Sequence, residues 1–342
     1  MFKKLYRFTF ILLSPVLLGV GWCIYLTSHR TPNFAYQSMI VLFCLTRGLS
    51  NDLMSKVIGI FRRPYIYSNY EGVLGKSTKL DLENIDQRLR KDGYYVFNNG
   101  LSEEQCEALL EFATTQECTH KLINDEKVIG EKRDIYPRGA PQATRYEFYA
   151  QDLLKVKLVQ KLIADNSLAD VAQRYLGASP LVDIVHMWWA TDFSENPDKE
   201  AAQFYHFDMD RPKWIKFFFY ITDVEPNNGP HVFVKGSHKT NSIPSSILKK
   251  GYGRLSDAEV IDHYGEDKII EFISKKGTII AEDSRGLHKG KHLQNGDRLV
   301  FQIQFSNSTF GSSYQKLRLG QDMTDELKES MLKYPRIYEN YI

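Results

Sequence analysis

Residues 213–239 read KWIKFFFYITDVEPNNGPHVFVKGSHK: a nearly unbroken apolar run, a turn rich in Pro, Asn and Gly, and a second apolar run. Short apolar runs bounded by such turn residues predict buried β-strands. The same pattern recurs in LVDIVHMWWATDF, QFYHFDMD, KIIEFIS, GTIIAED and DRLVFQIQF, all downstream of Pro180. Many short strands without helices between them are typical of an antiparallel sandwich or barrel.

Helices are expected on the N-terminal side of these strands. Residues 80–93 place apolar side chains at helical spacing and end at a glycine, and a capping-box pattern at Ser102 begins a second helix. Another helix, or a broken pair, is expected over residues 152–176. The predicted fold class is therefore mainly β with flanking helices, with a helical layer over residues 80–177 and a β core over residues 181–310.

Composition narrows the class of protein. The 342 residues include 44 Lys and Arg against 42 Asp and Glu, a net charge of +2, so no global field favours nucleic acid, and nucleic-acid binding is set aside. Aromatic residues make up 13% of the chain, which suits sheets with aromatic-lined pockets. Four scattered cysteines exclude a disulfide framework, and free thiols are preferred to a Cys106–Cys118 disulfide.

An uncharged apolar stretch lies near the N-terminus. Residues 8–26, FTFILLSPVLLGVGWCIYL, match the apolar thickness of a bilayer at about 1.5 Å rise per residue. A cleaved signal peptide is the alternative, but the run is long for one, and no small-x-small cleavage motif follows before His29 and Arg30. We interpret the stretch as a retained membrane anchor within residues 1–49, followed by a basic connector over residues 50–79.

The charges around this stretch leave its orientation open. Lys3, Lys4 and Arg7 precede it and favour a cytoplasmic N-terminus, which with a single span would put the rest of the chain outside. Residues 34–45, FAYQSMIVLFCL, form a second, shorter apolar stretch with basic residues behind it. If the two stretches form a short hairpin or a re-entrant dip, the chain returns to the cytoplasmic side. We predict that the body lies in the cytoplasm.

His206 and Asp208 stand two residues apart in QFYHFDMD. Alternate side chains of a strand share a face, so both would point into one barrel mouth. An imidazole and a carboxylate suit a divalent first-row metal ion, and two histidines with one carboxylate leave coordination positions open for substrates, as in non-haem Fe(II) oxygenases. The pair alone does not separate a metal site from a surface or capping pair.

The C-terminal strands offer the missing groups. His288 follows GTIIAED, and Arg298 begins DRLVFQIQF ten residues later. An arginine that opens a strand with an apolar alternate face can reach into a pocket, where its fork of donors fits a carboxylate with two hydrogen bonds. His292 is a competing distal ligand, but it falls in the following turn, so His288 is preferred.

Together these residues resemble a known family. The pair His206 and Asp208, then His288, then Arg298, in this order and spacing, are similar to the Fe(II)- and 2-oxoglutarate-dependent dioxygenases. More narrowly, FYITDVEPNNGPHVFVKGSHK resembles the segment of the phytanoyl-CoA dioxygenase family in which an apolar strand, an NGP turn and GSHK follow one another. The resemblance covers roughly residues 80–310.

The resemblance implies a fold and a division of the chain. The fold is a double-stranded β-helix, a cupin-like jelly roll, within a dioxygenase domain over residues 80–320. A C-terminal helix and tail, taken to be solvated, would follow over residues 321–342. One departure is Gly290, because some members of the family carry Ser two residues after the distal histidine. The second polar contact to 2-oxoglutarate therefore stays unassigned.

The resemblance also implies the chemistry of the site. Fe(II) would be held by His206, Asp208 and His288, and Arg298 would pair with the distal carboxylate of 2-oxoglutarate. With O2, and with ascorbate as a reductant, the cosubstrate would yield succinate and CO2 while a C–H bond of the substrate is hydroxylated. The carboxylate ligand favours hydroxylation over the halogenation of related enzymes that lack it.

Several other residues are weighed for roles around this site. His238, in KGSHK, is interpreted as a structural cap of the turn. Arg145 is a candidate for an anionic group of the substrate, against an ordinary surface arginine. Trp188 and Trp189 cannot both face inward from one strand, so one is a candidate for the substrate mouth, while core packing is the default interpretation.

The sequence thus favours a membrane-tethered Fe(II)/2-oxoglutarate dioxygenase that acts on a small, lipid-like or lipid-linked substrate, and the preference for a lipid rests on the anchor alone. Two alternatives stay open. One is a non-catalytic jelly-roll binding or scaffold protein with a vestigial site. The other is a dioxygenase that acts on a protein or glycan side chain.

Overall fold

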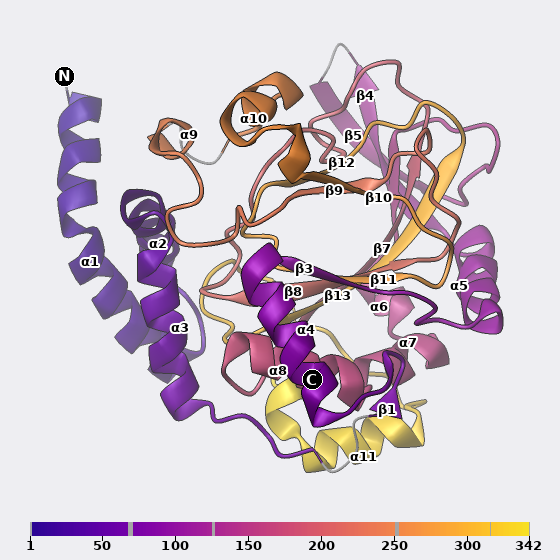
Figure 1. Ribbon diagram of the computed structural model, residues 1–342, viewed down its shortest axis with the longest axis horizontal. Coiled ribbons are helices and arrows are strands. Elements are labelled where there is room, and N and C mark those ends of the chain that lie inside the picture. Colours follow the sequence, from indigo (N-terminus) through magenta and orange to yellow (C-terminus); the bar gives the residue numbers. More distant parts are fainter. Residues whose placement is uncertain (1, 68–70, 125–126, 250–252, 315, 342) are drawn as a thin grey trace.

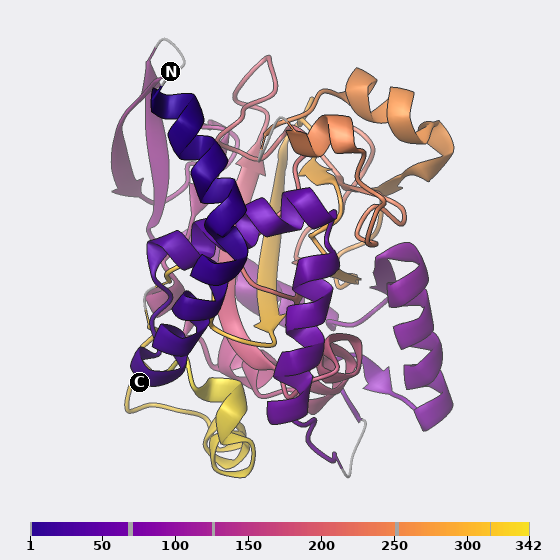
Figure 2. The same ribbon diagram turned by 90° about the vertical axis from the view of Figure 1, so that its left-hand side faces the viewer.

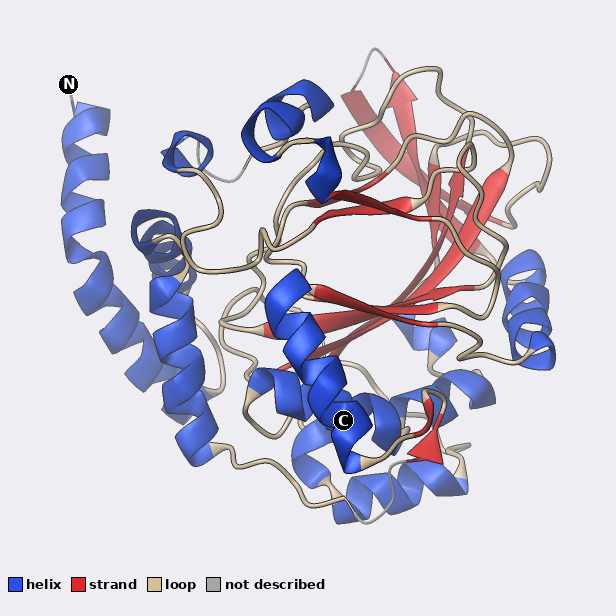
Figure 3. Cartoon of the chain, viewed as in Figure 1, coloured by secondary structure: helices blue, strands red, loops and turns tan. Residues whose placement is uncertain are grey.

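Two antiparallel β-sheets face each other at the centre of the protein (Figures 1 and 3). The computed structural model describes residues 2–67, 71–124, 127–249, 253–314 and 316–341. The large sheet has the strand order β3-β11-β8-β13-β7-β6-β4-β5, and the small sheet has the order β10-β9-β12. A separate two-stranded ribbon pairs β1 with β2.

The strands of the large sheet are β3 (Tyr94–Phe97), β4 (Cys118–Asn124), β5 (Lys127–Asp134), β6 (Arg145–Glu147), β7 (Leu181–Thr191), β8 (Trp214–Tyr220), β11 (Ile279–Glu282) and β13 (Asp297–Ser306). The small sheet consists of β9 (His231–Val234), β10 (Ile269–Phe272) and β12 (His288–Gly290), and the ribbon of β1 (Glu71–Gly72) and β2 (Gly75–Lys76). The helices are α1 (Phe2–Ser28), α2 (Asn33–Thr46), α3 (Leu49–Phe61), α4 (Lys79–Asp92), α5 (Glu103–Thr115), α6 (Ala150–Leu153), α7 (Lys157–Ile163), α8 (Asn166–Leu176), α9 (Ser245–Lys249), α10 (Asp257–Tyr264) and α11 (Asp325–Lys333), with 3-10 turns η1 (Glu266–Lys268) and η2 (Pro335–Tyr338).

Strand β8 lies inside the large sheet between β11 and β13, as predicted for a central strand. Because alternate side chains of a strand point to opposite faces, β8 serves two compartments. Ile215, Phe217 and Phe219 belong to the main core between the large sheet and the helices. Lys216 and Phe218 instead line the cavity between the two sheets. One strand therefore both anchors the core and presents side chains to the cavity.

The prediction of a strand over residues 203–210 is wrong. Within this segment Tyr205 forms an isolated bridge with Leu255, and His206 forms one with His288. The chain then turns at Pro212, which has no amide hydrogen to continue a ladder. The segment is held by long-range backbone bonds at three positions, Tyr205, His206 and Asp208, whose amide donates to the carbonyl of Ser284 at 2.9 Å, rather than by a continuous ladder.

The region predicted as a helical layer, residues 80–177, contains α4 to α8 and also β3 to β6. The helix ends follow the predicted signals: α4 ends at Gly93, whose φ is 92°, and α5 begins at the capping box of Ser102. Strands β4, β5 and β6 extend the large sheet at one edge. Their sequences, such as KVIGEKRD, are too polar for the apolar-run pattern of a buried strand.

Helices α1, α2 and α3 lie across one face of the body, which Figure 2 turns toward the viewer. Among the described residues one helix, Thr9–Ser28, is long and apolar enough to cross a membrane, a property it shares with signal sequences. Helix α2 packs Phe43 against Phe207, with ring centroids 5.7 Å apart. Helix α3, within the predicted connector, packs against the body.

The predicted C-terminal helix is present as α11, but the prediction of a solvated tail after it is wrong, because the chain there packs against the body. Helix α11 buries Leu327 completely, and Tyr334, Ile337 and Tyr338 are buried in the main core. The helix is amphipathic, with one apolar side facing the body.

The four cysteines are free thiols, as the sequence predicted.

A buried ion pair ties the chain after the segment 203–210 to strand β7. Arg211 contacts both carboxylate oxygens of Asp183, at 2.7 and 2.8 Å, and both side chains are at most 2% exposed. Removing Arg211 would leave the carboxylate of Asp183 buried without a counter-charge. Arg211→Ala should therefore lower the free energy of unfolding by roughly 3–5 kcal/mol, measured in urea titrations. As a control, Lys121→Ala, which breaks the exposed pair with Glu200, should cost less than about 1 kcal/mol. Equal losses in the two variants would contradict this account.

Candidate metal centre

His206 and His288 come together through a direct backbone pairing. The amide of His206 donates to the carbonyl of His288 at 3.0 Å, and the amide of His288 donates to the carbonyl of His206 at 2.9 Å. The two imidazole rings lie 4.3 Å apart between centroids. Residues 82 positions apart in the chain are thus locked side by side, with β12 of the small sheet as the frame.

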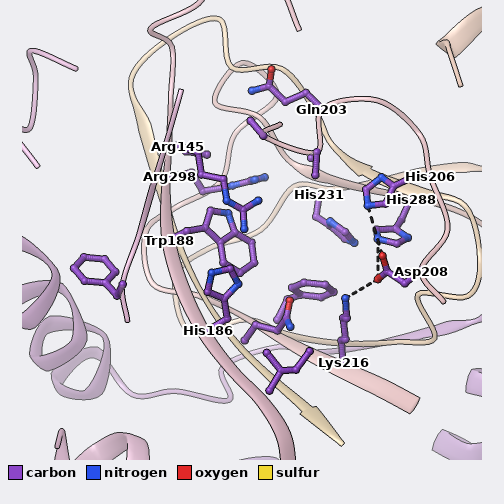
Figure 4. A pocket seen from close by; sticks show the side chains of 18 of the residues that line it. Arg145, His186, Trp188, Gln203, His206, Asp208, Lys216, His231, His288 and Arg298 are labelled. Atoms are coloured by element: carbon purple, nitrogen blue, oxygen red, sulfur yellow. Dashed lines mark hydrogen bonds and ion pairs between the residues drawn. The ribbon is translucent and has the colours of Figure 1, made fainter. Parts of the chain in front are cut away.

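Asp208 completes the group that the sequence predicted. The potential ligand atoms of His206, Asp208 and His288 all lie within 4.8 Å of one another, and all three residues are buried. Nε2 of His206 lies 3.8 Å from Oδ1 of Asp208, and Nε2 of His288 lies 3.6 Å from Oδ2. Figure 4 shows the two rings and the carboxylate converging at one end of a pocket.

The backbone selects the tautomer of both histidines. Nδ1 of His206 lies 2.9 Å from the carbonyl oxygen of Phe204, and Nδ1 of His288 lies 3.0 Å from that of Gly286. A carbonyl only accepts, so each Nδ1 must carry the hydrogen. Nε2 of both rings then keeps its lone pair and points toward Asp208, which is the arrangement a metal requires of imidazole.

Burial and nearby charge set the protonation states for metal binding. Burial lowers the pKa of His206 well below its usual value, with the neighbouring His288 adding to the effect. Burial likewise lowers the pKa of His288. Burial opposes ionisation of Asp208, but Lys216 and the two histidines hold its pKa below the usual range. Two neutral imidazoles and one carboxylate fit a first-row divalent ion without further change.

Lys216, which the sequence reasoning missed, reaches this centre from strand β8. Its Nζ donates to Oδ2 of Asp208 at 2.6 Å. Burial disfavours the ammonium, yet Asp208 and Asp210 hold the pKa of Lys216 above its ordinary value. The pair leaves Oδ1 of Asp208 as the less engaged oxygen. The sequence did contain an indication of this role, because Lys216 is a charged residue within an otherwise apolar strand.

A second buried pair lies beyond the ligands, and the sequence did not predict that its two members meet. Nε2 of His231 lies 2.8 Å from Oε2 of Glu282. Burial raises the pKa of Glu282 to about 8 and lowers that of His231 to about 3. Both groups are therefore neutral near pH 7, with the carboxyl of Glu282 donating to His231.

Arg298 lies in the same pocket with unused hydrogen-bonding capacity. The side chain is 4% exposed, and its Nε and Nη1 have no hydrogen-bond partner among the described residues. A buried guanidinium without a carboxylate is costly, so the arrangement suits an anion from outside the chain. A Cβ at Gly290 would lie 3.3 Å from Nη2 of Arg298, so the glycine leaves room beside the arginine.

The pocket has a volume of about 460 Å³ and runs from the metal centre to β7 and β13. Its walls include the apolar side chains of Phe148, Ile184, Trp188, Phe218 and Leu293. Arg145 also lines it, with its guanidinium 4.5 Å from the Trp188 ring centroid and Nε 2.6 Å from Glu147. Of the two tryptophans, Trp188 lines the pocket and Trp189 is fully buried.

The remaining histidines named from the sequence lie away from the three ligands. Nδ1 of His292 lies 3.1 Å from Oε1 of Gln203, so the structure does not group it with His206 and Asp208. Nε2 of His238 lies 3.2 Å from the carbonyl oxygen of Arg90, at the end of α4. His238 therefore joins the turn after β9 to a helix.

Glu282 should make the stability of the metal-free protein depend on pH. Its pKa in the folded state is raised from 4.5 to about 8, so its contribution is fully present below about pH 4.5 and is lost as pH rises through 8. Glu282→Gln keeps a hydrogen-bonding group for His231 but cannot ionise. In chelator-treated protein, urea unfolding between about pH 5 and pH 8 should show a steeper loss of stability in the wild type than in the variant. Parallel profiles would contradict the assignment.

Comparisons with known proteins place this site in a family. The model of the phytanoyl-CoA dioxygenase (PhyH) family matches residues 89–298. The ectoine dioxygenase of Sphingopyxis alaskensis is 23% identical over 218 residues, which cover 58% of this chain and 66% of that protein. The match thus spans slightly less than two thirds of the relative.

Several solved structures match the chain at low sequence identity and with TM-scores below 0.5. EctD from S. alaskensis has a TM-score of 0.43 at 19% identity, covering 72% of this chain and 83% of that one. The epimerase SnoN from nogalamycin biosynthesis has a TM-score of 0.45 at 16% identity, covering 67% and 84%. HygX from Streptomyces hygroscopicus, solved with nickel and 2-oxoglutarate, has a TM-score of 0.44 at 14% identity, covering 74% and 94%.

The family match covers more than half of the chain and contains His206, Asp208, His288 and Arg298. The chain belongs to the phytanoyl-CoA dioxygenase family.

Proposed function

We propose that the protein is a membrane-tethered Fe(II)- and 2-oxoglutarate-dependent dioxygenase that hydroxylates a C–H bond of a small, lipid-like or lipid-linked substrate and releases succinate and CO2. One observation carries the proposal: two neutral imidazoles, one carboxylate and an arginine with free donors line a single pocket. The facing antiparallel sheets support the assignment of the core to a double-stranded β-helix.

In this proposal three side chains bind the metal, and neighbouring groups fix the orientation of those side chains. Fe(II) would be bound by His206, Asp208 and His288, and it would supply the activation of O2 and the oxidation of the cosubstrate. The Nδ1 contacts to backbone carbonyls fix both imidazole rings before the metal arrives. Lys216 occupies Oδ2 of Asp208, which favours coordination through the other oxygen.

Arg298 is the proposed partner of the distal carboxylate of 2-oxoglutarate. A bidentate contact would use the guanidinium donors that lack partners among the described residues. The surrounding wall is largely apolar, with Phe218 and Leu293, so a charge-assisted bond there faces little competition from water.

Two features support an apolar substrate with a polar end. The pocket continues from the metal centre past Ile184 and Trp188, whose side chains suit an alkyl or ring system. Arg145 stands at this wall and would meet an anionic or polar group of the substrate, although Glu147 already neutralises part of its charge. The apolar helix Thr9–Ser28 supports delivery of such a substrate from a membrane.

His206→Ala should abolish succinate formation in an assay with Fe(II), ascorbate, O2 and 2-oxoglutarate, because the metal loses an imidazole ligand. The same reaction without added substrate should be measurable in the wild type as slow, uncoupled turnover. The matched control is His292→Ala, which removes the competing histidine four residues beyond His288 and should leave succinate formation largely intact. Loss of succinate formation in His292→Ala would instead make His292 the distal ligand, and full activity of His206→Ala would refute His206 as a metal ligand.

Arg298→Ala should weaken 2-oxoglutarate binding by roughly 1.5–3 kcal/mol per lost charged hydrogen bond, or at least tenfold. Titration calorimetry of the metal-loaded protein measures this directly. Lys291→Ala is the control, since Lys291 also lines the pocket but pairs with Glu271 at 2.8 Å. Equal affinity of the wild type and Arg298→Ala would remove Arg298 from the cosubstrate site.

A further inference from the structure

Helix α3 buries its polar side. Asn51 is fully buried and its Nδ2 donates to the carbonyl of Pro212 at 3.3 Å, while Oγ of Ser55 accepts from Nδ2 of Asn307 at 2.9 Å. A helix at the surface of a soluble protein normally turns such residues to water and its apolar stripe to the core. Of the three buried side chains of α3, Asn51 and Ser55 are polar and only Ile58 is apolar.

The outward side of α3 is apolar. Large side chains at helical spacing are exposed to between 48% and 76% along its whole length: Leu49, Leu53, Val57, Ile60 and Phe61. Residues four apart share a helix face, so these side chains form one continuous stripe opposite Asn51 and Ser55. An exposed apolar stripe of this length marks a surface that contacts something other than water.

Helix α1 lies on the same side of the molecule as α3 (Figures 1 and 2), and it too carries exposed apolar side chains. Its exposed side chains are Leu12, Leu13, Val16, Val20 and Ile24, each at least 40% exposed. Both helices on this side of the body therefore expose large apolar side chains.

The C-terminal half of α1 is fixed to the body. Tyr25 donates to or accepts from the hydroxyl of Thr309 at 2.8 Å, and Trp22 and Tyr25 pack on the fully buried ring of Phe310. Gly21 lies so close to α2 that a Cβ there would sit 2.1 Å from Cβ of Ala35. This half of the helix cannot enter a bilayer on all sides without leaving the body.

The undocked half of α1 is too short to span a bilayer. Even all of α1 before Leu18, residues 2–17, extends only about 24 Å at 1.5 Å per residue, against about 30 Å for the hydrocarbon core, and Ser14 within this part is fully buried. A helix held in this way can lie in one leaflet with its outer side in lipid, as interfacial helices do.

Exposed basic residues accompany the apolar face. Lys56 lies on α3, Arg63 follows its end, and Arg30 follows α1, all of them exposed. The acidic residue of α3, Asp52, is paired inward with Arg285 at 2.9 Å. Positive charge beside an apolar surface complements the headgroups of anionic lipids.

We propose that the outer sides of α1 and α3 form one lipid-contacting surface, with α1 lying in a single leaflet rather than spanning, so that the body rests against an anionic bilayer. The proposal rests on the membrane tethering in the proposed function and specifies its geometry. It replaces a span followed by a free connector with a rigid attachment, since α3 is hydrogen-bonded to the body.

The test uses the full-length chain in vesicles of phosphatidylcholine and phosphatidylglycerol. Cys23, which is exposed, is replaced by Ser; Cys106 and Cys118 are buried and Cys44 is half-buried, so one added cysteine carries an environment-sensitive fluorophore. Val57→Cys samples the outer side of α3. Glu107→Cys, exposed on α5 at the opposite side of the molecule, is the matched control.

We expect nitroxide-bearing lipids to quench the fluorophore at position 57 severalfold more than the one at position 107, and aqueous iodide to show the opposite order. Equal iodide quenching at both positions would overturn the proposal, because α3 would then face water. Shielding of position 57 from both quenchers would also overturn it, because a protein, such as a second copy of the chain, would then cover the face.

The position of α1 is tested separately. A biotin acceptor peptide placed before Met1 should be labelled from the same side of intact vesicles as the body, and labelling only after the vesicles are opened would make α1 a span and overturn the in-plane arrangement. Succinate formation is measured in the same preparations. Loss of lipid contact with intact turnover would refute the surface alone, whereas lipid contact without turnover would refute the proposed chemistry alone.

Discussion

The pair of backbone hydrogen bonds between His206 and His288 is the constraint on which the rest of the site depends. Together with the Tyr205–Leu255 bridge and the bond from the Asp208 amide to Ser284, it fixes the segment after residue 203, which has no strand ladder of its own. With it, two imidazoles meet at the edge of the cavity, and each ring is oriented by a carbonyl only two residues away in its own segment. The metal-binding geometry is thus built from backbone contacts before any ion is present.

Several titratable side chains around this centre stand in pairs. Asp208 is held by Lys216, Glu282 is neutral beside His231, and Asp183 is neutralised by Arg211. Buried charges without partners are costly, which explains why these pairs are present. Arg298 departs from this pattern, because part of its guanidinium has no partner within the described residues. The free-energy cost of burying this unpaired charge is offset when an anionic ligand binds to it.

The N-terminal helices belong to the same structural unit as the pocket. Phe43 of α2 stacks on Phe207, which stands between the two ligands His206 and Asp208. Asp52 of α3 pairs with Arg285, which in turn contacts Asp283 just before the distal histidine's segment. Contacts that hold the apolar face to the body therefore also support the segments that carry the metal ligands.

Much of the local structure followed from the sequence, because it depends on neighbouring residues. Helix α4 ends at Gly93 and α5 begins at Ser102, where a left-handed φ and a side-chain cap are set locally. The central strand β8 was predicted from its apolar run. The strands β4 to β6 were not, because polar edge strands are specified by their partners rather than by their own hydrophobic pattern.

By itself the sequence determined the residue types that can bind a metal and a carboxylate: His206, Asp208, His288 and Arg298, in an order that matches a family. Only the tertiary structure decided which groups surround them. Lys216 and Glu282 acquire their roles from partners distant in the chain, and α3 shows its polar side to the body because the body offers polar partners there. The periodicity of apolar residues shows that one side of a helix is apolar and the other polar. Which side faces the body depends on long-range packing, so only the folded chain reveals which side faces outward.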